Sequence, residues 1–282
     1  MKVGIVGYGH LGQHLVEFIL KEGQKHDLEI CFVWNRSPSK LSNTLPQSQV
    51  LLDLKNAATH CPDLIVEVAH PQITKDYGEF FLSIANYMIG SPTALADLDL
   101  ESSLYAAATK YSRALYVPSG AFWGAQDIKK MADLGVLSEL KVTMKKHPSA
   151  FRLSGQLHER NQRLMNSSDE GSALVLYEGP VRELCALAPN NVNTMAAAAV
   201  AGHNLGFDKV VGRLISDVRL KNWHIVEVDA CGLPNKAGDC FSVTTLRKNP
   251  ATPGAVTGSA TFKSFCNSLL LARNTGSGVH MC

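Results

Sequence analysis

The chain has 282 residues, of which 45% are hydrophobic, and its formal net charge is +2. The 27 basic and 25 acidic side chains leave no cationic excess for a nucleic acid. The seven cysteines are widely spaced and form no CxxC pair, which argues against a zinc site and suits a reducing compartment. The sequence shows neither a secretory signal nor an apolar run long enough to cross a bilayer. We therefore expect a cytoplasmic protein without a metal, a membrane or a nucleic acid as partner.

The first 118 residues alternate between short apolar strands and helix-sized segments. The pattern predicts a helix after the first strand, another near 75–86, and strands at 2–6, 29–34, 63–69, 87–90 and 114–117. Such alternation is typical of βαβ units, which form a parallel sheet covered on both faces.

A glycine loop, Gly7-Tyr8-Gly9-His10-Leu11-Gly12, joins the first strand to the first helix. Gly7 permits the tight turn, Gly9 permits close approach of a pyrophosphate, and Gly12 permits helix–strand packing. The following helix N-terminus offers backbone N–H groups to phosphates. We therefore predict a Rossmann-type domain over residues 1–118 that binds NAD or NADP through Gly7, Gly9, His10, Leu11 and Gly12.

The end of the second strand bears on which dinucleotide is bound. An acidic residue there usually binds the ribose 2′-hydroxyl of NAD, but this chain has Asn35-Arg36. No carboxylate would repel a 2′-phosphate, and the Arg36 guanidinium could pair with it. We expect Asn35 and Arg36 to contact the cofactor, with NADP accepted alongside NAD or in preference to it. The alternative is that Arg36 is only a solvated loop residue.

The second half loses the regular alternation and predicts an α+β substrate and dimerisation domain over residues 119–256 with an open antiparallel sheet. Its strands are expected at 138–145, 173–177, 211–218, 224–228 and 240–246, and its helices at 125–134 and 194–202. An open sheet has edges that must be covered, which favours a homodimer. We expect a helix over 257–273 to return to the first domain, and the residues beyond Asn274 to be loose.

Four segments together resemble the L-aspartate dehydrogenase family in its vertebrate form, nearly from end to end. They are the glycine loop, Val117-Pro-Ser-Gly-Ala121, Ala188-Pro-Asn-Asn-Val-Asn193 with the alanines after it, and Asn222-Trp-His224 with Glu227 beyond. The resemblance implies NAD(P)-dependent oxidation of L-aspartate to iminoaspartate, which hydrolyses to oxaloacetate and ammonia. The family's usual metabolic role is the synthesis of NAD precursors.

The resemblance also assigns roles to single residues. It makes His224 the catalytic acid and base, places the backbone N–H of Ala121 at the cofactor, and places Asn191 or Asn193 there as well. The family usually carries Lys-Pro-Pro where this chain has Lys145-Lys146-His147-Pro148, and smaller residues where it has Trp123. Lys145 or Lys146 is the expected ligand of the substrate carboxylates, although each alone could be a solvated surface lysine.

The chemistry by itself also favours a histidine. Amino-acid oxidation needs a neutral amine and then an activated water, and one group titrating near neutrality can serve both proton transfers. Of the ten histidines, His70 ends the third strand and could also face the nicotinamide. Asn191 could instead cap the alanine-rich helix, and Glu67 or Asp97 could orient a histidine.

Three alternative functions are compatible with this sequence. The first is an aspartate dehydrogenase. The second is a related NAD(P)-dependent dehydrogenase or reductase acting on another small amino-acid-like substrate, with the build of homoserine dehydrogenase or dihydrodipicolinate reductase. The third is a cofactor-binding regulatory protein with little turnover. Retention of His224, Ala121 and Asn193 argues against the third, and the altered lysine segment keeps it open.

Overall fold

The structure, a computed structural model, describes residues 1–42, 44–166, 171–273 and 275–282. It divides into two compact units, one formed by Met1–Pro118 with Phe265–Cys282 and the other by Ser119–Ser264. The short 3-10 turns apart, the first unit contains β1 (Lys2–Val6), α1 (His10–Glu22), β2 (Glu29–Trp34), β3 (Val50–Leu51), β4 (Leu64–Glu67), α2 (Pro71–Ile84), β5 (Asn86–Ile89), α3 (Leu98–Lys110), β6 (Ala114–Val117), the end of α9 (Ser259–Leu271) and β12 (Gly278–Met281).

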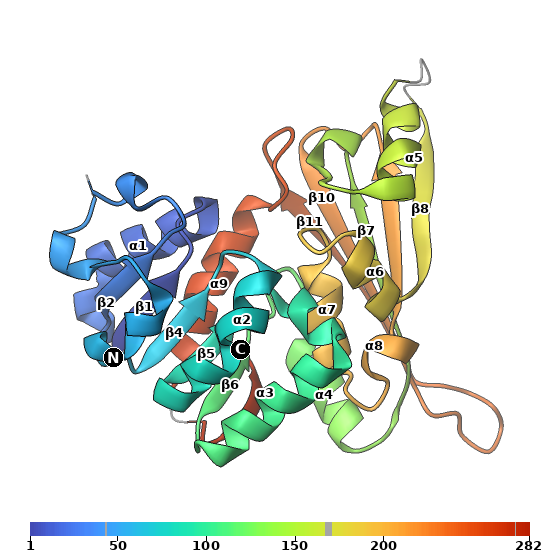
Figure 1. The fold of residues 1–282 in the computed structure, drawn as a ribbon. Helices are drawn as coiled ribbons and strands as arrows, with labels where there is room; N and C mark the ends of the chain where they lie inside the picture. The colour runs from blue at the N-terminus through green and yellow to red at the C-terminus, as the bar shows by residue number, and fades with distance from the viewer. Residues whose placement is uncertain (43, 167–170, 274) are drawn as a thin grey trace. The chain divides into compact units, whose positions relative to one another are not determined.

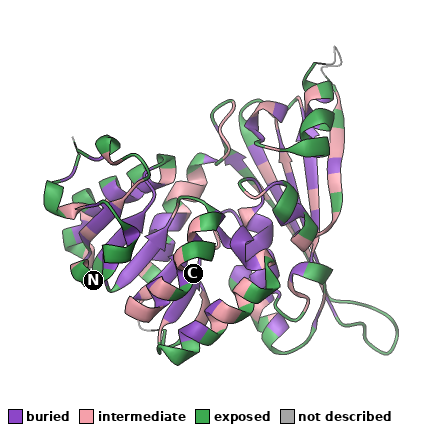
Figure 2. Ribbon diagram, in the orientation of Figure 1, coloured by how far each residue is buried: buried purple, intermediate pink, exposed green. Residues whose placement is uncertain are grey.

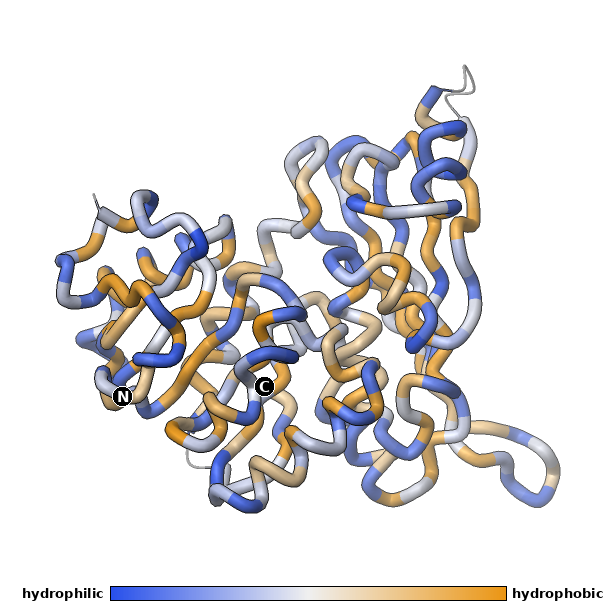
Figure 3. The backbone as a smooth tube through the Cα atoms, in the orientation of Figure 1, coloured by the Kyte–Doolittle hydropathy of each residue, from blue (hydrophilic) through white to orange (hydrophobic). Residues whose placement is uncertain are grey.

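The described residues of the first unit form a seven-stranded sheet in the order β12-β6-β5-β4-β1-β2-β3, with every pair parallel. Apart from Lys2 and Asn86 at their starts and the buried Glu67 at the end of β4, the central strands β1, β4 and β5 are buried and mostly hydrophobic (Figures 2 and 3). Side chains from α1 and from the Phe265–Leu271 part of α9 share one core with β1 and β4. Helices α2 and α3 pack together against the sheet's other strands (Figure 1). The predicted Rossmann-type parallel sheet is therefore confirmed.

Two elements of the first unit differ from expectation. The sequence pattern predicts no helix over Leu98–Lys110, which forms α3, and it predicts loose residues beyond Asn274. Instead β12 pairs in parallel with β6. A hydrogen bond of 2.8 Å between the hydroxyls of Tyr116 and Thr275 fixes the strand's approach. The prediction of a loose tail is wrong because an open edge of the parallel sheet supplies the backbone partners that a short terminal segment needs.

The second unit contains α4 (Ala125–Asp133), β7 (Leu137–Lys146), α5 (Gly155–Met165), β8 (Ala173–Pro180), α6 (Val181–Leu187), α7 (Asn193–Ala201), α8 (Gly206–Lys209), β9 (Val211–Asp217), β10 (Trp223–Gly232), β11 (Ser242–Pro250) and the start of α9. Within its described residues the sheet is five-stranded, in the order β11-β10-β7-β9-β8. Helices α4, α6 and α7 cover one face, on which β7 and β10 place alternate buried residues (Figures 1 and 2).

The α+β class of the second unit is as predicted, but its sheet is mixed rather than purely antiparallel. The β7–β9 pair is parallel, and the other pairs are antiparallel. The parallel pair arises because α5, β8 and three helices separate β7 from β9, a connection long enough to return the chain to the same end of the sheet. In the part of the chain that the structure describes, no helix is long and apolar enough to cross a membrane.

Candidate functional site

The glycine loop has the geometry that a pyrophosphate requires. Gly7 has a φ of 116°, and a Cβ on it would lie 2.8 Å from the Val68 carbonyl carbon, so only glycine fits this turn. A Cβ on Gly12 would lie 2.1 Å from the Gly7 oxygen, whereas one on Gly9 would meet no described atom within 4 Å. The N-terminus of α1 has no side-chain cap. The loop therefore combines two tightly packed glycines with an open cradle above backbone N–H groups, where His10 and Leu11 begin α1.

The two residues after β2 lie beside this loop but differ in their partners. Asn35 accepts a hydrogen bond from the Tyr8 backbone at 3.3 Å and donates one to the Ser37 carbonyl at 2.9 Å, so it ties the turn to the glycine loop. Arg36 is exposed and makes no side-chain hydrogen bond or ion pair within the described residues. Asn35 is thus already engaged in structure, and the Arg36 guanidinium is available for an anionic group.

A row of buried polar side chains crosses one end of the second unit's sheet. Lys146 on β7 is in register with Ser216 on β9, and His224 on β10 is in register with Asn249 on β11. Lys145 pairs with Ile225, so Lys146 and His224 are the next position along the same antiparallel ladder. Ser216 donates to Asn161 of α5 at 2.7 Å, which extends the row beyond the sheet. The burial of these polar groups needs a physical reason, because a buried polar group without a hydrogen-bond partner lowers folding stability.

Lys146 and His224 are the two titratable members of the row, with relative exposures of 3% and 5%. Burial lowers the pKa of Lys146 to about 8. Burial, followed by the charge of Lys146, lowers the pKa of His224 to about 4, while a hydrogen bond to the Ala255 backbone acts in the opposite direction. His224 is therefore a neutral imidazole at neutral pH, able to accept a proton.

The segment after β11 encloses this pair. Lys146 donates to the Val256 carbonyl at 3.0 Å and lies 5.8 Å from the centre of the Phe151 ring. A Cβ on Gly258 would lie 3.8 Å from the Nδ1 atom of His224. Lys146 makes no ion pair with a described carboxylate. A buried ammonium bonded to a carbonyl and lacking a counter-ion is suited to receive an anionic ligand.

Lys145, the alternative carboxylate ligand, projects from the other face of the same strand. Its ammonium pairs with Glu227 at 3.0 Å, and both side chains remain 30% exposed. Strand alternation separates the two lysines, so only Lys146 joins the row that contains His224.

The predicted cofactor residues Ala121, Asn191 and Asn193 also lie in the second unit. Ala121 follows Gly120, whose φ of 58° sets the loop's turn, and Phe122 closes that turn onto the Ser119 carbonyl at 2.8 Å. The Asn191 amide accepts from the Arg152 backbone N–H at 3.2 Å and donates to the Arg152 carbonyl at 2.6 Å.

Asn193 is the first residue of α7, and its buried Oδ1 atom has no hydrogen-bond partner among the described residues. Val192, not Asn191, occupies the N-cap position of α7 and makes no side-chain cap bond. The capping role considered for Asn191 is therefore wrong, because its amide holds the Arg152 backbone instead. The orphaned oxygen of Asn193 is suited to accept a bond from a ligand N–H group.

Other candidates from the sequence have local roles. The Nδ1 atom of His70 accepts from the Gln72 backbone and caps α2. Asp97 caps α3 and pairs with Lys75 at 2.9 Å. Glu67 is fully buried and accepts from three backbone N–H groups and from a serine hydroxyl, so neither acid orients a histidine ring. Among the described residues no group of three His, Cys, Asp or Glu could hold a metal ion.

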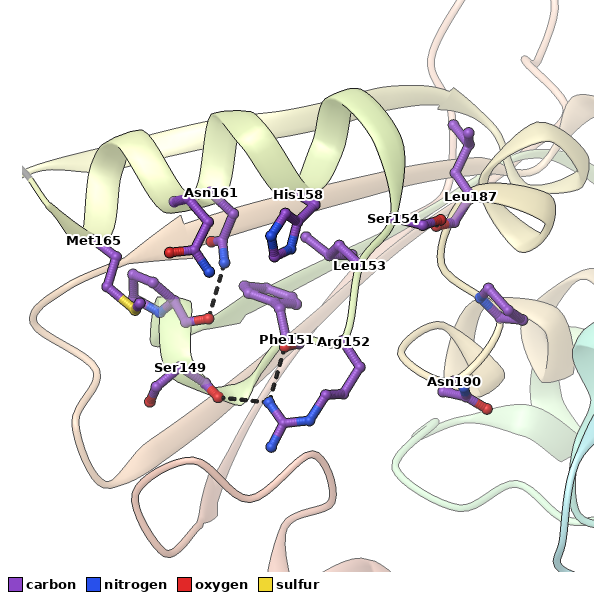
Figure 4. Close-up of a pocket in the computed structure, with 13 residues that line it drawn as sticks. Ser149, Phe151, Arg152, Leu153, Ser154, His158, Asn161, Met165, Leu187 and Asn190 are labelled. Atoms are coloured by element: carbon purple, nitrogen blue, oxygen red, sulfur yellow. Dashed lines mark hydrogen bonds between the residues drawn. The ribbon is translucent and has the colours of Figure 1, made fainter.

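A pocket of about 550 Å³ lies beside the row, between α5, the segment after β7 and the α6–α7 connection (Figure 4). Asn161 belongs to both the pocket wall and the row, and it donates to the Pro148 carbonyl at 3.0 Å. Phe151 lines the pocket and also contacts the Lys146 ammonium. None of the described residues that line this pocket carries a carboxylate, so these residues add no negative charge near Lys146.

Two polar neighbours of His224 are not predicted from the sequence, namely Asn249 and Arg247 on β11. Asn249 is 2% exposed and accepts from the Arg247 Nε atom at 2.7 Å. The Arg247 Nη1 atom donates to the Gly120 carbonyl at 3.1 Å. The strand was expected to end at Leu246, but its alternation continues to Pro250 and places Arg247 and Asn249 on the covered face.

The parallel sheet, its glycine loop and the second unit's neutral imidazole beside a buried ammonium define an NAD(P)-dependent oxidoreductase. Comparison with known proteins narrows this class. Residues 7–118 match the model of the homoserine dehydrogenase NAD-binding domain, and residues 127–268 match that of the aspartate dehydrogenase C-terminal domain. The chain therefore belongs to the aspartate dehydrogenase family, whose members are NAD(P)-dependent amino acid dehydrogenases.

Individual relatives agree with this assignment. An aspartate dehydrogenase domain-containing protein from Xenopus tropicalis is 52% identical over 100% of this chain and 98% of its own length. An L-aspartate dehydrogenase from Methanococcoides burtonii is 29% identical over 81% of this chain and 83% of its own. The crystal structure of an aspartate dehydrogenase from Thermotoga maritima has the same fold, with a TM-score of 0.68, 21% identity and coverage of 98% and 97% of the two chains.

Proposed function

We propose that this protein oxidises L-aspartate to iminoaspartate with NAD or NADP, and that the imine hydrolyses to oxaloacetate and ammonia. The observation that carries the proposal is the buried pair of Lys146 and His224. Lys146 supplies a cation that has no counter-ion among the described residues, and His224 supplies a neutral proton acceptor. A dicarboxylic amino acid needs both.

Each unit, taken by itself, contains residues that suit one part of the cofactor. The open cradle at Gly9 and the uncapped start of α1 suit the pyrophosphate, with His10, Leu11 and Gly12 beside it. Arg36, exposed and without an ion pair among the described residues, suits a 2′-phosphate, and Asn35 holds the turn that carries it. The Oδ1 atom of Asn193, which no described residue bonds, and the backbone of Ala121 suit the nicotinamide end. When bound, the nicotinamide accepts a hydride from the substrate Cα.

Two residues of the chain itself would bind the substrate carboxylate and accept the proton of the substrate ammonium group. Lys146 would bind one substrate carboxylate and fix the amino group near His224. The His224 imidazole would take the proton that leaves the ammonium, so that the nitrogen lone pair is free to form the imine as the hydride departs. After deprotonation has reset it, the same imidazole would accept a proton from the water that attacks the imine carbon.

Purified protein tests the proposal directly. NADH and NADPH formation would be followed with L-aspartate and with a panel of other amino and hydroxy acids, and the reverse reaction would be measured with oxaloacetate and ammonia. Turnover selective for aspartate supports the proposal. Turnover on a different substrate would assign the chain to a related reaction, and cofactor binding without any turnover would assign it a regulatory role.

Assembly and location are part of the same proposal. Exposed apolar side chains Val243 and Leu246 lie on β11, the edge strand of the second sheet, which supports a homodimer. No disulfide joins any two cysteines of the described residues, which supports residence in the cytoplasm. Light scattering of the purified protein tests the first point, and fractionation of cells the second.

A further inference from the structure

Arg247 connects two parts of the second unit that are far apart in the sequence. Its Nη1 atom donates to the Gly120 carbonyl at 3.1 Å, across 127 residues, and its Nε atom donates to the Asn249 oxygen at 2.7 Å. One guanidinium therefore bridges the loop that carries Ala121 and the strand paired with His224. A planar fork with several fixed donors can bridge two acceptors in this way, whereas a lysine ammonium is a single point of charge.

Asn249 transmits this connection to His224. It lies directly across the β10–β11 ladder from His224 and is almost completely buried. A Cβ on Gly258 would lie 3.1 Å from the Asn249 Cβ and 3.8 Å from the His224 Nδ1 atom, so Gly258 lies close to both residues. The Asn249 side chain is thereby held by Arg247 through its amide oxygen, and its Cβ lies against Gly258, which also lies beside the imidazole.

Arg247 has no carboxylate partner among the described residues, and its burial lowers its pKa. An ion pair with an acid would stabilise such a group more than a carbonyl and an amide oxygen do. Burial of the Arg247 guanidinium between a loop and a strand therefore lowers folding stability. A role in fixing the geometry of that loop and strand would account for its position.

We propose that Arg247 and Asn249 form a positioning pair that holds the Ala121 loop at a fixed distance from the His224 imidazole. This inference rests on the proposed function, in which Ala121 contacts the cofactor and His224 accepts the substrate proton. Displacement of reacting groups by about 1 Å can reduce turnover about 100-fold. The pair acts through the loop and the imidazole and does not touch the reacting atoms.

The test compares Arg247→Met and Arg247→Lys with Lys248→Met, a matched change at the exposed neighbouring residue. Loss of a charge-assisted hydrogen bond should raise the Kd for NADH about tenfold in Arg247→Met, measured by NADH fluorescence without substrate. It should lower kcat for aspartate as well, and added guanidinium ion at millimolar concentration should restore part of both. Arg247→Lys should be intermediate, and Lys248→Met should match the wild type.

Two further readouts separate positioning from simple destabilisation. The double variant Arg247→Met with Asn249→Ala should differ from Arg247→Met alone by no more than about twofold in its Kd for NADH and in kcat. Both substitutions disrupt the same positioning pair, so their effects should not add. The NMR signals of the His224 ring, assigned with His224→Gln, should shift in Arg247→Met and not in Lys248→Met. Unchanged NADH affinity and unchanged ring signals in folded Arg247→Lys and Arg247→Met would overturn the proposal.

The same measurements distinguish failure of this inference from failure of the proposed function. If the wild type binds NADH but does not oxidise aspartate, the proposed function fails. The NADH titration and the His224 signals still report on the pair in that case, since neither requires turnover. A tenfold loss of NADH affinity with shifted ring signals would then support the positioning pair, and no change in either would overturn it.

Discussion

The Lys146 ammonium and the His224 imidazole are buried neighbours on β7 and β10, and the charge of the lysine helps lower the pKa of the histidine. The lysine itself bonds to the Val256 carbonyl and makes no ion pair with a described carboxylate. Burial of such an ammonium reduces folding stability. The arrangement is explained if the missing counter-ion is a carboxylate of the substrate, which would be attracted to the ammonium and placed beside the imidazole.

Replacement of Lys146 by methionine should therefore stabilise the protein and impair catalysis. The folded pKa of about 8 lies below the ordinary 10.5, so the unfolded chain binds the proton more tightly, and at pH 7 the buried charge costs at most about 3 kcal/mol. Wild-type stability should rise as the pH increases from 8 to 10.5, and Lys146→Met should lack this rise. The variant's kcat/KM for aspartate should fall about 10- to 100-fold.

Urea denaturation at pH 7 and pH 9.5, together with steady-state kinetics, checks both effects. Lys145→Met is the matched control, because Lys145 pairs with Glu227 on the other face of β7. It should leave the pH dependence of stability unchanged and should affect kcat/KM less than Lys146→Met does. A larger kinetic loss in Lys145→Met would assign carboxylate binding to that lysine.

His224 should govern the acid side of the pH profile. Because its pKa is lowered to about 4, the imidazole stays neutral over the range in which an ordinary histidine with pKa 6.5 would protonate. The acid limb of kcat/KM should accordingly lie well below pH 6.5 and should move upward in Lys146→Met, which removes the neighbouring charge. His224→Ala should reduce turnover about 100-fold or more while the protein remains folded.

These expectations are checked by initial rates between pH 4 and pH 9, with circular dichroism at each pH to confirm folding. His203→Ala, which changes a histidine half exposed at the surface, serves as the comparison and should retain wild-type rates. Full activity in His224→Ala would remove this residue from the mechanism.

Much of the fold could be predicted because its signals are local. The glycine loop and the apolar strands of the first unit are predicted directly by the spacing of their residues. Helix α3 was missed because only Leu104, Ala107 and Ala108 of its residues are buried, so its periodicity is weak. Strand β12 was missed because a four-residue segment becomes a strand only where β6 offers an edge.

The site was less predictable because it depends on the register between strands. His224 and Lys146 were named from the sequence, but their adjacency follows from the pairing of β7 with β10, which are far apart along the chain. Asn249 joins them through a third strand. The choice between Lys145 and Lys146 could not be made without knowing which face of β7 is covered. Register between distant strands depends on tertiary packing and is not encoded by local spacing.

Arg36 should determine the response to the 2′-phosphate of NADP. Its guanidinium is exposed beside the turn that Asn35 ties to the glycine loop, and it makes no ion pair within the described residues. Arg36→Ala should lower kcat/KM for NADP about tenfold relative to NAD, and Arg36→Asp should lower it further through charge repulsion. Kinetics with both cofactors measure this ratio. Lys40→Ala is the control for a general loss of surface charge, and an unchanged ratio in Arg36→Asp would leave Arg36 as a solvated loop residue.

Glu67 should make the first unit's stability depend on pH in an unusual direction. Its carboxylate accepts from the backbone N–H groups of Ala69, His70 and Ser91, as well as from the Ser91 hydroxyl, and so joins the loops after β4 and β5. Burial nevertheless raises its pKa from 4.5 to about 7, although these donors lower it. Between those values the unfolded chain loses the proton first, so the free energy of unfolding should fall as the pH rises, by at most about 3 kcal/mol.

Glu67→Gln should abolish that fall, because the amide does not titrate. It should also lower stability at pH 4.5, since its NH₂ group would face donors rather than acceptors. Thermal unfolding between pH 4.5 and pH 8, with amide exchange at Ala69 and Ser91, measures both effects. Glu79→Gln changes an exposed carboxylate on α2 and should keep the wild-type pH dependence. If Glu67→Gln kept it as well, the titrating group would have to be another residue, and the loops after β4 and β5 would be joined by a carboxylate that stays charged throughout.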